Sequence, residues 1–203
     1  MSQFRFGSLL RTLGFIRLPR IENRDQLIEF IDSRASYVSQ VTLYTYVKAR
    51  AGTQYPKLFS NEDFLTSLRI ARWHIYGAAV CDLCLFAGAQ FNKAGRLDPD
   101  SSRDAACSMI DDVFIRNDQT DITAERYASI ADQGHQRAAF ANWADIADGP
   151  TAFQNSSDAV FEWAPIADQL KSEDEEIIRN SIHLRWIGVR RDLKHTLVPD
   201  FPI

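Results

Sequence analysis

Two cysteines flank an aspartate in Cys81–Asp82–Leu83–Cys84, and His74 stands seven residues before Cys81. On one helix these spacings put His74, Cys81 and Cys84 on the same side, and Cys107 from a following helix can approach them. Three thiolates and an imidazole form a known zinc set, whereas a C-x-x-C pair with a low pKa is redox-active. Apolar mid-helix surroundings raise a thiol pKa, and no tight turn supplies a ligand pair. We therefore expect packed cysteines, no cofactor and no metal, with zinc as the weaker alternative.

Asp82 is the carboxylate that most needs an explanation. Its apolar neighbours require it to be paired, hydrogen-bonded or neutral. Two roles stay open at this point. It is either a structural partner for Arg69, Arg72 or an arginine of another helix, or a functional carboxylate with a raised pKa in an interhelical pocket. The candidate pocket residues are His74, Asp82 and His135.

His135 follows Asp132 at one-turn spacing. A di-iron bundle needs two Glu-x-x-His pairs and two further glutamates, and no glutamate in this chain precedes a histidine at that spacing. His135 lies among small residues of a predicted helix, so we expect it to pack there with a hydrogen-bond partner.

Residues 1–20 carry four arginines and no acidic residue, giving a charge of +4. On a helical wheel the larger apolar side chains share one side, and such a basic amphipathic segment suits an anionic membrane surface or a partner protein. The candidate docking residues are Phe4, Arg5, Phe6, Leu9, Leu10, Arg11, Leu13, Phe15, Ile16, Arg17 and Arg20. Two alternatives stay open: packing on the body of the protein, and organellar targeting.

The elements that must position these residues have helical rather than alternating periodicity. The sequence predicts an all-α protein of six to seven helices, in an orthogonal or bundle arrangement around a central apolar helix over about 61–93. The helical domain covers 21–203, with sub-boundaries near 98 and 150.

Capping residues predict where the helices begin and end. Asn23 and Gly52 bound the first long helix. The other predicted starts are Ser60, Asp98 before Pro99, Ser157, and Ser172 with Glu175. One further helix is expected to run without a break over about 123–147.

Composition narrows the function classes. The chain has 203 residues, is 45% hydrophobic and carries a net charge of −4, which includes a −7 block over 98–148. Three cysteines fit a reducing, cytoplasmic compartment. The apolar run Trp73–Phe91 contains Asp82, which favours a buried helix over a bilayer span. The basic patch near the C-terminus is modest, so nucleic-acid binding is not favoured.

The sequence contains no G-x-S-x-G, no P-loop and no dinucleotide-binding motif. The first hypothesis is therefore a non-enzymatic helical interaction protein, an adaptor or assembly factor. It would dock through its N-terminal segment to a membrane surface or a larger complex, and would be cytoplasmic or peripheral to the membrane. The alternative is a small-molecule-binding protein or enzyme with a pocket near Asp82 and His74.

Overall fold

The structure is a computed structural model that describes residues 19–117 and 121–203. Its helices are α1 (Arg24–Ala51), α2 (Tyr55–Leu58), α3 (Glu62–Lys93), α4 (Pro99–Arg116), α5 (Ala124–Ala139), α6 (Trp143–Asp148), α7 (Gln154–Trp163), α8 (Asp168–Glu173) and α9 (Glu175–Thr196). The 3-10 turns Gly52–Gln54 and Pro150–Phe153 join some of them. Within the described residues, extended pairing is limited to one bridge between Ile21 and Leu197. The all-α prediction is confirmed.

The described helices outnumber the predicted six to seven because segments expected to be loops form short helices. The expected loop over 52–60 contains the four-residue helix α2. The expected helix over 123–147 is two helices, since α5 ends at Ala139 and Asn142 starts α6 by accepting a hydrogen bond from the Asp145 N–H. A good capping residue inside a helical pattern thus ended one helix and began another.

Several predicted helix ends are confirmed. The Asn23 side chain accepts a hydrogen bond from the Gln26 N–H at the start of α1, and Gly52 ends that helix with a φ of 51°. Asp98 caps α4, and Pro99 is its first residue. Because both caps satisfy backbone groups that the helix leaves unpaired, the local sequence was sufficient to place these ends.

Three predicted caps are wrong. Asn61 rather than Ser60 caps α3, because its side chain accepts the Phe64 N–H. Ser157 lies inside α7. Ser172 donates to the Asp168 carbonyl within α8, so it caps nothing at the start of α9. Ser60 and Ser172 instead donate to the backbone carbonyls of Lys57 and Asp168, as short hydroxyl side chains readily do.

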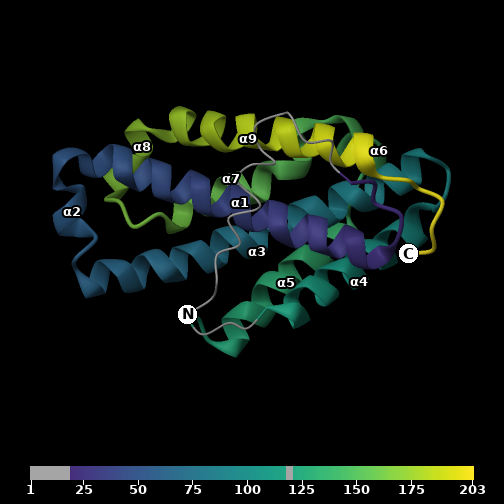
Figure 1. The fold of residues 1–203 in the computed structure, drawn as a ribbon, viewed down its shortest axis with the longest axis horizontal. Helices are drawn as coiled ribbons and strands as arrows, with labels where there is room; N and C mark the ends of the chain where they lie inside the picture. The colour runs from purple at the N-terminus through teal and green to yellow at the C-terminus, as the bar shows by residue number, and fades with distance from the viewer. Residues whose placement is uncertain (1–18, 118–120) are drawn as a thin grey trace.

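Helix α3 is the centre of the fold, as predicted. It packs against α1, α4, α5, α6 and α7, and α1 crosses it near the middle of the molecule (Figure 1). By length and composition α3 could cross a membrane, but 78% of its most apolar window is buried inside the protein. One hydrophobic core includes buried residues of α1, α3, α4, α5, α6, α7 and α9.

Candidate functional site

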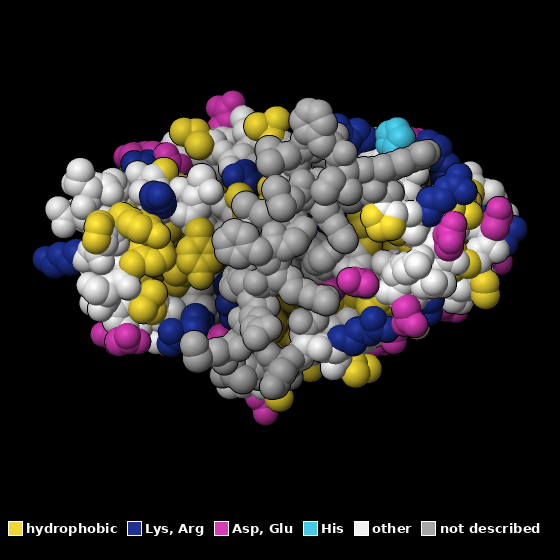
Figure 2. All heavy atoms as spheres, in the orientation of Figure 1, with side chains coloured by type: hydrophobic (Ala, Val, Ile, Leu, Met, Phe, Trp, Pro, Cys, Tyr) yellow, Lys and Arg dark blue, Asp and Glu magenta, His cyan; other side chains and the backbone are white. Residues whose placement is uncertain are grey.

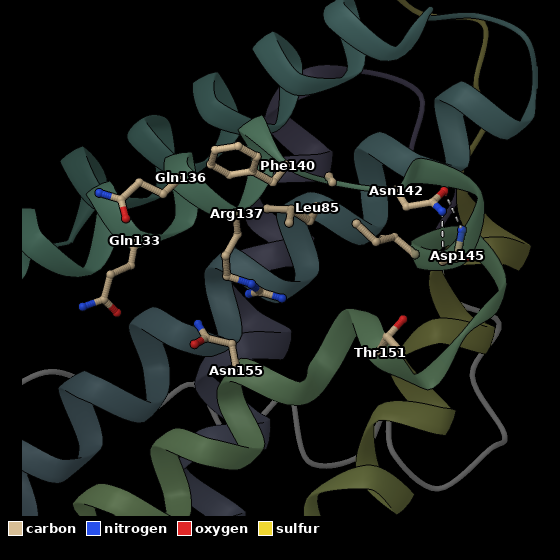
Figure 3. Close-up of a pocket in the computed structure, with 11 residues that line it drawn as sticks. Leu85, Gln133, Gln136, Arg137, Phe140, Asn142, Asp145, Thr151 and Asn155 are labelled. Carbon is tan, nitrogen blue, oxygen red and sulfur yellow. Dashed lines mark hydrogen bonds between the residues drawn. The ribbon is translucent and has the colours of Figure 1, made fainter.

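A cleft runs between α5 and α7, above the central helix α3 (Figure 3). Both helices pack on α3, but they make little contact with each other. The cleft consists of two hollows of about 640 Å³ and about 270 Å³. Both hollows are lined by Gln133 of α5 and Asn155 of α7, so they are neighbouring parts of one open groove.

The floor of the cleft is one stripe of α3. His74 and Ala78 line the smaller hollow, and Leu85 lines the larger one. This stripe spans twelve residues, from His74 to Leu85, or about 16 Å along the helix. The walls combine apolar, amide and charged side chains. On one side lie Arg126, Ser129, Ile130, Gln136, Phe140, Ala141, Asn142, Asp145 and Ile146, and on the other Thr151, Asp158, Ala159, Glu162 and Trp163.

Arg137 of α5 enters the larger hollow and reaches toward α3, with Asn155 opposite on α7 (Figure 3). Its Nη1 donates to the Asp82 carboxylate at 2.5 Å. The Asp82 side chain is fully buried, whereas 30% of the Arg137 side chain is exposed. The ion pair therefore joins a carboxylate in the core to a guanidinium at the surface of the cleft.

Asp82 has a second partner on the α7 side of the cleft. The Ser156 N–H donates to its other oxygen at 2.7 Å. The Ser156 hydroxyl donates to the Phe153 carbonyl and accepts from the Trp186 indole N–H at 3.0 Å. Through this buried network Asp82 ties α3 to α5, α7 and α9.

Opposing influences set the pKa of Asp82. Burial raises the pKa of this carboxyl, and the Arg137 guanidinium and the Ser156 N–H both oppose that rise. Because two donors satisfy the carboxylate oxygens, the geometry is that of an ionised carboxylate held by its partners. The sequence left two roles open for Asp82. The structure shows the first of them, pairing with an arginine of another helix.

His74 lies at the other end of the cleft and stacks on Trp163. The two rings are 3.4 Å apart and inclined by 2°. Burial, followed by the positive charge of Arg126, lowers the pKa of His74 to about 4. The imidazole is therefore neutral at physiological pH and forms an aromatic wall of the smaller hollow.

The chain was compared with known proteins. No family model, curated protein or solved structure matches it.

The third candidate pocket residue, His135, is not in the cleft. Its Nε2 lies 3.0 Å from a carboxylate oxygen of Asp111 on α4. His135 thus lies close to an aspartate of the neighbouring helix, but its Nε2 forms no hydrogen bond within the described residues. His74 lines the smaller hollow, Asp82 is buried and bonded to Arg137 of the larger hollow, and His135 lines neither hollow.

The cysteines and His74 do not come together. Cys81 faces α5, where its thiol donates to the Ile130 carbonyl at 3.7 Å, while His74 faces Trp163 of α7. Cys84 is fully buried and Cys107 is half-buried on α4. Among the residues that the structure describes, no group of three or more potential ligands is placed to hold a metal ion. The zinc alternative thus has no site in the described part of the chain.

The predicted N-terminal docking residues lie almost entirely outside the described residues, which begin at Pro19. Of that set the structure describes Arg20, which is exposed. Ile21 follows and is hydrogen-bonded to Thr196 and Val198, so the chain enters the fold beside the end of α9.

Sequence reasoning missed most of the cleft. Arg137, Asn155 and Trp163 were not predicted, because partly buried residues on separate helices carry no periodic signal. One signal did exist for Arg137. It stands between Gly134 and Ala138, on the seam of small residues that packs toward the core, where a charge needs a buried partner.

A second surface feature is an aromatic cluster at the end of the molecule formed by α2 and the adjoining ends of α1 and α3. Figure 2 shows apolar side chains gathered there. Phe59 is the central ring, and its centroid lies 4.3 Å from Tyr55, 5.5 Å from Phe64 and 6.1 Å from Tyr44. These ring contacts pack α2 against the adjoining ends of α1 and α3, so we interpret the cluster as structural.

Proposed function

We propose that this protein is a non-enzymatic helical interaction protein, an adaptor or assembly factor, that holds a segment of a partner protein in the α5–α7 cleft. The observation that carries this proposal is the cleft itself. It is a groove whose walls mix apolar, amide and charged side chains, and it contains an arginine held in place by a buried carboxylate.

The dimensions of the cleft favour a peptide segment over a compact small molecule. Its floor is about 16 Å long, and an extended chain advances about 3.3 Å per residue, so about five residues of a partner would fill it. Phe140 is 90% exposed at the rim and offers an apolar surface that a partner would cover. Such grooves bind peptides by combining apolar contacts with hydrogen bonds to a few fixed polar groups.

The N-terminal segment remains part of this proposal as a second docking element. It would bring the protein to an anionic membrane surface or to a larger complex, while the cleft would select the partner. The support for this role is its composition, with +4 charge and no acidic residue over residues 1–20.

Site-specific photo-crosslinking in cells tests the cleft. A photoreactive amino acid replaces Gln136, which is exposed and lines the cleft, and a matched probe replaces the exposed Gln169 on α8. We expect Gln136 alone to link to one recurrent short segment of a partner, which mass spectrometry then identifies.

A cleft-filling variant provides the control. Gln133→Trp places a large side chain where the two hollows meet, and Gln169→Trp makes the same change away from the cleft. Loss of the cross-link in Gln133→Trp alone would support the proposal. A small metabolite that co-purifies with the wild-type protein and is lost in Gln133→Trp would instead favour the small-molecule alternative and overturn it.

A further inference from the structure

The guanidinium of Arg137 is only partly used by the protein. A guanidinium has five N–H groups in a fixed plane. One Nη1–H donates to Asp82, and Nη2 makes a long contact of 3.5 Å with the Ala152 carbonyl. Within residues 19–117 and 121–203, no acceptor contacts Nε. Because Arg137 lines the cleft, its remaining donors are available to an occupant.

The charge of this guanidinium is already balanced. Asp82 is fully buried and touches Arg137 directly, so the pair is neutral as a unit. A carboxylate binding to the free edge of Arg137 would share one positive charge with Asp82, and two carboxylates at one such site repel each other. A carbonyl oxygen accepts the same hydrogen bonds without adding a charge.

We infer that Arg137 binds a neutral carbonyl oxygen of the segment in the cleft, and that Asp82 is the positioning residue that sets this preference over a carboxylate. The ligand class is therefore a main-chain or side-chain amide. Because a helix uses its own carbonyls internally, the segment would be extended. This inference rests on the proposed function for the identity of the occupant, but the chemistry of the cleft can be tested separately.

The neighbouring side chains match an amide ligand. Asn155 lies opposite Arg137 and lines both hollows, as does Gln133. Each carboxamide has both donor and acceptor atoms, so it can pair with a peptide N–H and a peptide carbonyl. The Arg137 donors and these two carboxamides together provide complementary partners for one stretch of extended backbone.

The test uses two small probes of similar size, N-methylacetamide and acetate, added to the full-length protein at pH 7.5. Nitrogen-15 NMR follows the Nε–H signal of Arg137 and the side-chain amide of Asn155. The control is Arg179, whose guanidinium already pairs with Asp158 and Glu175. We expect N-methylacetamide to shift the signals of Arg137 and Asn155, with acetate binding at least about tenfold more weakly.

The Asp82→Asn variant removes the negative charge that balances Arg137. With Asp82 neutral, Arg137 is an uncompensated cation, so acetate should bind at least about tenfold more tightly than to the wild type. Equal binding of both probes to the wild type, or no shift with either, would overturn the inference. If Asp82→Asn does not fold, the wild-type comparison still decides. Failure of the proposed function would appear separately, as the absence of a cross-linked segment at Gln136.

Discussion

Gly134 of α5 packs directly against Cys81 of α3, so closely that a Cβ atom on the glycine would lie 2.5 Å from the cysteine sulfur. The same atom would lie 2.9 Å from Cδ1 of Ile110 on α4. Because glycine has no side chain, α3, α4 and α5 can pack closely at this point. This packing sets the distance between α5 and the floor of the cleft.

Gly134→Ala should lower the free energy of unfolding by about 1–3 kcal/mol, because the added methyl group overpacks this contact and outweighs the better helix propensity of alanine. The matched control is Gly188→Ala in α9, where a Cβ would meet nothing within 4 Å. There the substitution should stabilise the protein by about 0.5–1 kcal/mol. Urea unfolding of both variants checks the opposite signs.

Removal of the Arg137 side chain should be strongly destabilising. Arg137→Ala leaves the buried Asp82 without its ionic partner, and such a loss costs about 3–5 kcal/mol. Arg126→Ala on the same helix removes an exposed arginine and should change stability by less than about 0.5 kcal/mol. Equal effects of the two substitutions would show that the pair contributes little.

The stability of Arg137→Ala should also depend on pH. Burial raises the pKa of Asp82, and without Arg137 that rise is less opposed. A raised carboxyl pKa means that the folded state holds the proton more tightly than the unfolded state, so its stability falls as pH increases. The difference in stability between Arg137→Ala and the wild type should therefore be smaller at pH 4 than at pH 8, as measured by thermal unfolding.

His74 gives the opposite pH dependence. Its pKa falls from 6.5 to about 4 in the folded protein, so the unfolded state binds the proton more tightly. The protein should lose stability as pH falls from 6.5 toward 4, by on the order of 2 kcal/mol at pH 4.5 for a partly exposed ring. His74→Phe keeps a ring against Trp163 and should lose this component. The prediction would be contradicted if denaturant titrations gave His74→Phe the same stability difference between pH 7.5 and pH 4.5 as the wild type.

The three cysteines should be poorly reactive in the native protein. Burial raises the pKa of Cys81 to about 12 and that of Cys84 well above its usual value, while burial and nearby aspartates raise the pKa of Cys107. A thiol reagent at pH 8 should label Cys107 slowly and the other two only after unfolding. Cys107→Ser should abolish native-state labelling, and rapid reaction of two thiols would contradict the packing.

Deletion of residues 1–18 tests the N-terminal docking element, which lies outside the described residues. We expect the full chain, but not the truncated one, to co-sediment with vesicles of phosphatidylserine and phosphatidylcholine, since each arginine near an anionic surface contributes about 1 kcal/mol. Pure phosphatidylcholine vesicles and raised salt are the controls. Binding that survives the deletion would move the membrane contact to another part of the protein.

The sequence by itself determined the helical class, the central helix and several helix ends. Helical periodicity and caps such as Asn23 and Asp98 act through neighbours a few residues away, so they can be found along the chain. The same reasoning required a partner for Asp82, because a buried carboxylate cannot remain alone.

Only the tertiary structure decided which partner it is. Asp82 pairs with Arg137 and Ser156, which stand 55 and 74 residues further along the chain. Likewise His74 meets Trp163, and Asn155 faces Arg137, because α5 and α7 both pack on α3. The cleft is a consequence of how three helices pack, and helix packing depends on side-chain shape at contacts that no local pattern records.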